Sequence, residues 1–91
     1  MSGNIKDEYA ALFEAVLKLS SVEDCELFFA DLLTIKELNS MAQRVQAARL
    51  LLKGATYEQI IKATDISSAT LSRVSRCVKY GEGYKKVLAD K

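Results

Sequence analysis

The stretch from residue 67 to residue 80 combines small polar side chains with regularly spaced cations. If it forms a helix from Ser68 to about Tyr80, the outward face begins with small residues and ends with cations. A helix in the major groove needs small side chains where its N-terminal end approaches the bases, and longer cations that reach bases or phosphates. This pattern favours DNA binding over a merely solvated polar face. The predicted DNA-contacting residues are Ser67, Ser68, Ala69, Thr70, Ser72, Arg73, Arg76 and Lys79.

The residues just before this helix have the pattern of a helix-turn-helix. Thr56 is a good N-cap for a short helix from Tyr57 to Thr64. A helix-turn-helix also needs apolar residues in its first helix, a tight turn, an apolar plug and apolar contacts inside its second helix. Candidates for these parts are Ile60 and Ile61, both expected to be buried, Asp65 in the turn, Ile66 as the plug, and Leu71 and Val74. Ile61 and Asp65 replace the usual small residue and glycine, which leaves a plain helical hairpin as the alternative.

Longer amphipathic segments precede this pair of helices. Apolar residues at helical spacing predict helices over residues 5–19, 22–33 and 35–53, and a short helix follows in the tail after residue 81. The third helix is apolar on several sides, more than a lone chain of 91 residues can cover. We therefore expect an all-α protein of six helices, in which a second copy of the chain covers part of the third helix.

Charge divides the chain into an acidic part and a basic part. Overall, 13 basic and 12 acidic residues give a net charge of +1. Residues 1–34 hold two lysines against seven acids, a net charge of −5, whereas residues 35–91 hold eleven cations against five acids, a net charge of +6. The basic part suits a polyanionic partner, and the acidic part suits solvent or a sister chain.

Composition argues against catalysis and metal binding. The chain has no histidine, the side chain that titrates near neutral pH, and its two cysteines, Cys25 and Cys77, cannot form a four-ligand zinc site. We predict no enzyme, no catalytic residue and no metal. Cations beside Cys77 could make its thiol more reactive, so a redox switch on the helix from Ser68 to Tyr80 stays open as a hypothesis. Without a signal peptide or an apolar run of about 20 residues, we expect a cytoplasmic protein with reduced thiols and no membrane contact.

From Asp31 to Tyr80 the sequence resembles the Trp-repressor-like superfamily. The motifs are Leu32-Leu33-Thr34, Gln43-Arg44-Val45, Leu50-Leu51-Leu52-Lys53-Gly54 and Ala69-Thr70-Leu71-Ser72-Arg73. Similarity to the YerC/YecD branch rests on Thr56-Tyr57, Ser72-Arg73-Val74, Arg76-Cys77-Val78-Lys79-Tyr80-Gly81 and Gly83-Tyr84. The resemblance implies a six-helix Trp-repressor-like fold, an intertwined homodimer with interlocked N-terminal helices, and one helix-turn-helix per chain in a bacterial transcriptional regulator.

The resemblance carries over an effector site only in part. Thr34, Arg44 and Arg73 match the threonine and the two arginines of the pocket in the tryptophan-sensing member. Val74 stands where a glycine leaves room for the ligand, and Cys77 stands where a serine contacts it. A branched side chain in a close-packed site costs about 1 to 3 kcal/mol, so we do not expect tryptophan as the effector. Three other roles stay open for the two arginines. They could bind another anion or aromatic acid, Arg73 could contact DNA, or both could form ion pairs with nearby acids.

These observations together predict one domain over residues 1–91. It has a helical dimerisation core over 1–53, the helix-turn-helix over 56–80 and a tail helix over 81–91. We predict a sequence-specific regulator, a repressor by the resemblance, that binds double-stranded DNA as a homodimer and needs no cofactor. The alternative is a dimeric interaction module whose basic part binds an acidic protein. The operator, the regulated genes, the choice between repression and activation, and any effector are not readable from the sequence.

Overall fold

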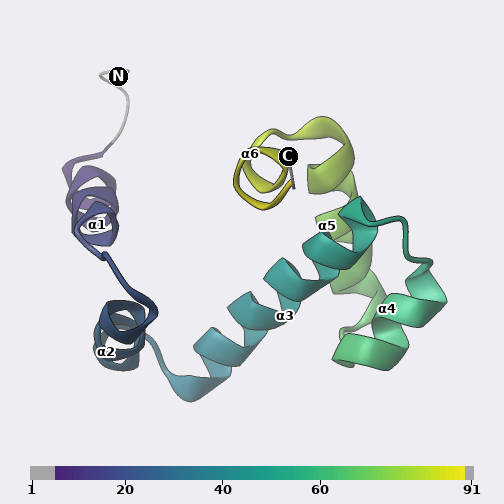
Figure 1. Ribbon diagram of the computed structural model, residues 1–91, viewed down its shortest axis with the longest axis horizontal. Helices are drawn as coiled ribbons and strands as arrows, with labels where there is room; N and C mark the ends of the chain where they lie inside the picture. The colour runs from purple at the N-terminus through teal and green to yellow at the C-terminus, as the bar shows by residue number, and fades with distance from the viewer. Residues whose placement is uncertain (1–5, 90–91) are drawn as a thin grey trace. The chain divides into compact units, whose positions relative to one another are not determined.

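The computed structural model describes residues 6–89, and every regular element within them is an α-helix. The helices of this range are α1 (Asp7–Leu17), α2 (Val22–Leu32), α3 (Ile35–Leu52), α4 (Tyr57–Thr64), α5 (Ser68–Tyr80) and α6 (Gly83–Leu88) (Figure 1). The prediction of an all-α fold with six helices is confirmed. The predicted start of the first helix at Ile5 lies outside the described residues.

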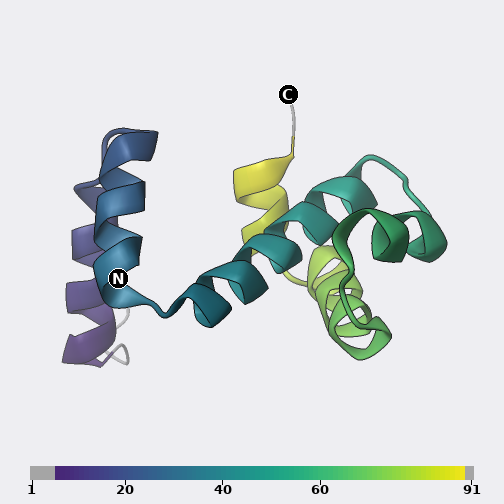
Figure 2. The same ribbon diagram turned by 90° about the horizontal axis from the view of Figure 1, so that it is seen from below.

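The helices belong to two units. Residues 1–34 hold α1 and α2, and residues 35–91 hold α3 to α6. In the second unit α3 packs against α4, α5 and α6, and α5 also contacts α4 and α6. Figures 1 and 2 show these three helices gathered along the C-terminal part of α3, with its first turns extending beyond them.

The second unit has a core that α3, α4 and α5 build together. Its buried residues are Ala47, Ala48, Ile60, Ile66, Leu71 and Val74, each at most 2% exposed. Half-buried apolar residues pack around them, and α6 contributes Tyr84 and Leu88 to this layer. The two alanines let α4 and α5 approach α3 closely. The core therefore fixes the helix-turn-helix against α3.

Residue types at the helix ends explain where α4 begins and ends. Gly54 follows α3 with a φ of 90°, in the left-handed region that favours glycine. The Thr56 hydroxyl accepts the N–H of Gln59 at 3.2 Å, and the Gln59 side chain accepts the N–H of Thr56 at 2.9 Å. This reciprocal capping satisfies two free donors of the first turn. Asp65 ends α4 with a φ of 61°, a conformation that Asp tolerates better than most residues.

In the first unit, hydrogen bonds hold the start of α2. The Ser21 hydroxyl accepts the N–H of Asp24 at 3.0 Å. The Asp24 carboxylate accepts the N–H and the hydroxyl of Ser20 at 3.1 and 3.0 Å. These hydrogen bonds hold the pKa of Asp24 below its ordinary value of 3.8, and the bond from the Ser20 N–H has the largest effect. Partial burial opposes the shift.

The first unit has no buried side chain in either of its helices. Phe28 and Phe29 pack edge to face with their ring centroids 5.5 Å apart, and both are only half-buried. The other large apolar side chains of α1 and α2 are exposed: Tyr9, Leu12, Phe13, Val16, Leu17, Val22, Leu27 and Leu32. An amphipathic helix gains its stability by burying its apolar face. These two helices therefore lack the packing that the second unit provides for its own.

Candidate nucleic-acid interface

The helix α5 has one buried face and one exposed face. Leu71 and Val74 are 0% and 2% exposed and lie in the core. The predicted DNA-contacting residues lie away from this face. Thr70 is half-buried, and the other seven are exposed, namely Ser67, Ser68, Ala69, Ser72, Arg73, Arg76 and Lys79. The buried face holds α5 on the body of the second unit, so that its outward face is open to a partner.

The N-terminal end of α5 is shaped by Ser67. Its hydroxyl accepts the N–H of Thr70 at 3.2 Å and donates to the Thr70 hydroxyl at 2.9 Å. These bonds engage the Ser67 hydroxyl, which belongs to one of the predicted DNA-contacting residues. The first N–H groups of a helix have no partner within the helix and suit an anion. The Ser68 hydroxyl and the N–H groups of Ser68 and Ala69 are thus the donors that remain for a phosphate.

Cations occupy the outward face of α5 further along the helix. Arg73, Arg76 and Lys79 are all exposed, and Lys62 in the last turn of α4 is exposed as well. Asp65 is the one acid of the sequence between Lys62 and Lys79. Within this segment only Asp65 therefore opposes the attraction of the cations to a polyanion.

The tail supports the end of α5. The ammonium group of Lys85 donates to the backbone carbonyl of Lys79 at 3.2 Å. Gly81 ends the helix with its N–H on the carbonyl of Cys77 at 2.8 Å, and a Cβ at Gly81 would lie 2.8 Å from that same oxygen. A side chain at this position would therefore require the backbone between α5 and α6 to shift.

One predicted core position of the helix-turn-helix is wrong. Ile60 is 0% exposed and Ile66 is 2% exposed, as expected, but Ile61 is 38% exposed. Neighbouring side chains on a helix diverge by about 100°. Because α4 directs one face toward α3 and α5, it can bury Ile60 but not Ile61. Ile61 instead lies on the surface of α4 beside Glu58, Gln59 and Lys62.

A polar contact that the sequence did not single out joins α3 to the turn. The side-chain amide of Gln43 donates to the backbone carbonyl of Thr64, the last residue of α4, at 3.1 Å. The Thr64 hydroxyl donates to the carbonyl of Ile60 at 2.8 Å and accepts the N–H of Ile66 at 3.3 Å. The only sequence signal is a glutamine in the amphipathic α3. Its partner is 21 residues away and is a backbone group, which no residue pattern predicts.

The predicted effector residues do not all lie in the same unit. Arg44 is half-buried on α3 and Arg73 is exposed on α5, two helices that pack on each other, whereas Thr34 ends the first unit. Val74, in place of the glycine, is a core residue at 2% exposure. The site over Thr34, Arg44 and Arg73 stays a prediction.

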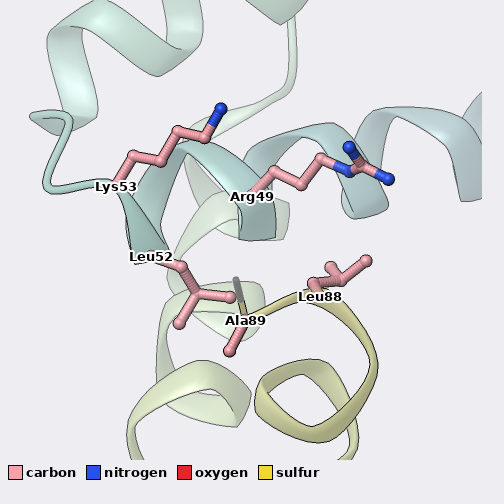
Figure 3. Close-up of a pocket in the computed structure, with 5 residues that line it drawn as sticks. All are labelled: Arg49, Leu52, Lys53, Leu88 and Ala89. Atoms are coloured by element: carbon pink, nitrogen blue, oxygen red, sulfur yellow. The ribbon is translucent and has the colours of Figure 1, made fainter. Parts of the chain in front are cut away.

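A pocket of about 210 Å³ lies between the C-terminal ends of α3 and α6. Its lining residues are Arg49, Leu52, Lys53, Leu88 and Ala89. Figure 3 shows the Leu52 side chain directed toward Ala89, with Arg49 and Lys53 extending away from this apolar contact. Neither Arg44 nor Arg73 lines this pocket, so it is distinct from the predicted effector site.

Within residues 6–89 there is neither a candidate metal site nor a membrane-spanning helix. This range contains no group of three or more His, Cys, Asp and Glu side chains that could hold a metal ion. None of its helices combines the length and the apolar character needed to cross a membrane. Cys25 and Cys77 are free thiols, each half-buried.

Comparison with known proteins gives consistent matches over nearly the whole chain. The family of Trp repressor proteins matches residues 7–91. YerC of Bacillus subtilis, an uncharacterized protein, is 44% identical over 84 residues, which cover 92% of this chain and 81% of YerC. A solved structure of a candidate Trp repressor from Staphylococcus aureus has a TM-score of 0.88 at 38% identity, covering 92% of this chain and 85% of that one. A TrpR-like protein from Eubacterium eligens has a TM-score of 0.86 at 38% identity, with coverages of 90% and 86%.

Proposed function

The chain belongs to the Trp repressor family, and from this premise we propose that it is a sequence-specific transcriptional repressor that binds DNA as a homodimer. The observation that carries the proposal is the exposed face of α5, which presents small polar residues and then Arg73, Arg76 and Lys79. Its opposite face is locked into the core by Leu71 and Val74. A regulator of bacterial transcription acts at the chromosome, so the proposal places the chain in the cytoplasm.

Packing supports the homodimer. The first unit buries none of its helical residues, and apolar side chains of α3 between residues 35 and 45 are exposed as well. Ile35 is 78% exposed, and Leu38, Met41 and Val45 are each about 40% exposed. Exposed apolar surface on this scale marks an association site. A second copy offers the same apolar faces, and a twofold contact between them would bury both sets.

Twofold symmetry then defines the DNA site. Two α5 helices would enter successive major grooves about 34 Å apart, so the operator should be a near-palindrome with half-sites about 10 bp apart. The first turn of α5 would hold a phosphate through its N–H groups, while Arg76 and Lys79 would reach bases or phosphates. Arg73 is available to either the DNA or an effector.

Selection of bound duplexes from a random pool at about 150 mM salt tests this function. The expected result is a twofold-symmetric motif, with light scattering giving a dimer for the protein. Enrichment without a motif would contradict sequence-specific regulation. If the chain also bound an acidic protein more tightly than any duplex, the competing function of a protein-interaction module would be supported.

Removal of the cations on α5 tests the docking geometry. The double variant Arg76→Ala, Lys79→Ala should weaken duplex binding and reduce the slope of log affinity against log salt by about 4, if both side chains of each chain in the dimer contact phosphates. The matched control removes the same two charges elsewhere, as Arg49→Ala, Lys18→Ala. Equal salt slopes for the α5 variant and the wild-type protein would contradict the geometry.

A further inference from the structure

The turn of the helix-turn-helix is connected to α3 by a directional hydrogen bond. Gln43 lies in the first half of α3, and its half-buried amide donates to the Thr64 carbonyl at 3.1 Å. Carbonyls in the last turn of a helix have no partner within that helix. Gln43 therefore satisfies an acceptor at the C-terminal end of α4 that would otherwise require water.

Thr64 carries this connection to both sides of the turn. Its hydroxyl donates back to Ile60 in α4 at 2.8 Å and accepts the N–H of Ile66 ahead of α5 at 3.3 Å. Between them Asp65 adopts its left-handed conformation, with its N–H on the carbonyl of Ile61 at 2.8 Å. The turn that sets the direction of α5 is thus fixed by one threonine, and that threonine is attached to α3 by Gln43.

We propose that Gln43 is a positioning residue that sets the direction of the recognition helix α5 relative to α3. This rests on the proposed function, because it matters only if two α5 helices read one duplex. In such a dimer α3 connects the apolar surface between chains to the core that carries α5. Core packing holds α5 in place, but apolar contacts are non-directional, whereas a hydrogen bond constrains an angle.

Loss of this bond should reduce specificity more than general affinity. A specific site requires both recognition helices in register, whereas non-specific binding depends on the total of phosphate contacts. Gln43→Met keeps the length of the side chain and removes the donor. We expect about a tenfold fall in affinity for the selected operator, with unchanged affinity and salt slope for random duplex.

The same substitution at Gln46 provides the matched control. Gln46 lies three residues further along α3, is exposed, and makes no side-chain hydrogen bond to residues 6–89. Gln46→Met should leave the ratio of specific to non-specific affinity at the wild-type value. If Gln43→Met lowers both affinities equally, or lowers neither in a folded protein, the proposal is overturned.

Amide hydrogen exchange in the free protein tests the connection without DNA. Gln43→Met should speed the exchange of the Asp65 and Ile66 amides several-fold, and Gln46→Met should not. Gln43→Glu keeps the shape but presents a carboxylate to the Thr64 carbonyl at neutral pH. Its Asp65 and Ile66 amides should regain protection when the carboxyl is protonated, at about pH 4, while wild-type protection stays level.

The two readouts separate the possible failures. If the wild-type protein selects no DNA motif, the proposed function fails, and exchange still decides whether Gln43 holds the turn. Unchanged exchange at Asp65 and Ile66 in Gln43→Met overturns the positioning role even when DNA is bound specifically. If Gln43→Met does not fold, the pH-dependent protection of Gln43→Glu decides alone, and its absence overturns the proposal.

Discussion

The first unit, residues 1–34, and the second unit, residues 35–91, differ in both charge and packing. The first has a net charge of −5 and buries no residue in its two helices, whereas the second has a net charge of +6 and a core of six buried residues. Both contain amphipathic helices whose N-terminal ends are capped by a side chain, namely α2 in the first unit and α4 and α5 in the second. The difference shows that the signals for forming a helix are local, whereas the burial that stabilises a helix depends on packing against another helix.

The two units also differ in what their surfaces offer. The second unit buries an apolar core and exposes the cations of α5, and it leaves apolar side chains exposed at the start of α3. The first unit exposes its apolar residues, and its acids would repel a polyanion. Each surface therefore suits a different partner, which is DNA for the second unit and a sister chain for the first unit and the start of α3.

The largest expected effect is the loss of a core residue from the second unit. Leu71→Ala, at a side chain that is 0% exposed, should lower the free energy of unfolding by about 2 to 5 kcal/mol because it leaves a cavity. Urea denaturation followed by circular dichroism measures it. Val87→Ala, at 77% exposure in the same unit, is the control and should change little. If Leu71→Ala and Val87→Ala lowered the free energy of unfolding equally, the buried core would not be the source of the second unit's stability.

A charge on the apolar surface of the first unit should break the dimer. Phe13→Asp, at 51% exposure on α1, should weaken self-association about 100-fold, because each chain would bury an unpaired carboxylate in the contact. Sedimentation equilibrium measures the dissociation constant. The second unit should keep its helical signal, and Glu14→Gln on the same helix should have a small effect. A dimer of unchanged strength would place the interface elsewhere.

A backbone substitution at the link between α3 and α4 should have an intermediate effect. Gly54→Ala should cost about 1 to 2 kcal/mol of stability, since its φ of 90° is strained for alanine although a Cβ would have no neighbour within 4 Å. Gly83→Ala is the matched control, because its Cβ is equally free and Gly83 begins a helix. Thermal melts should show Gly54→Ala destabilised and Gly83→Ala neutral or slightly stabilised. Similar shifts in melting temperature for both variants would contradict backbone strain at Gly54 as the cause.

The smallest effect concerns the capping carboxylate of the first unit. Because the pKa of Asp24 is lowered in the folded state, its contribution to stability is fully present above its unfolded pKa near 4 and is lost as the pH falls through the lower folded value. Asp24→Asn should therefore reduce stability at pH 7, and the difference should shrink as the pH is lowered from 4 toward 2. Melting temperatures of both proteins across this range test it. A constant difference at all pH values would exclude the titration as the cause.

Much of the second unit could be predicted because its signals are local. The bounds of α4 and α5 follow from Thr56, Asp65 and Ser67, whose side chains or backbone preferences act within four residues. The exposed face of α5 follows from helical spacing alone. Ile61 was assigned wrongly because spacing cannot show how wide a face α4 buries. The bond between Gln43 and Thr64 joins distant residues through a backbone carbonyl, and such contacts exist only once the helices are packed.

The most direct test of a dimer that reads two half-sites is to change the distance between them. Duplexes would carry the selected half-sites at the selected spacing, or with 5 bp added, which turns one half-site to the opposite side of the duplex. We predict two chains bound cooperatively to the first duplex and a loss of at least about 100-fold in affinity for the second. Equal affinity for both, with chains binding independently, would contradict a fixed dimer of recognition helices.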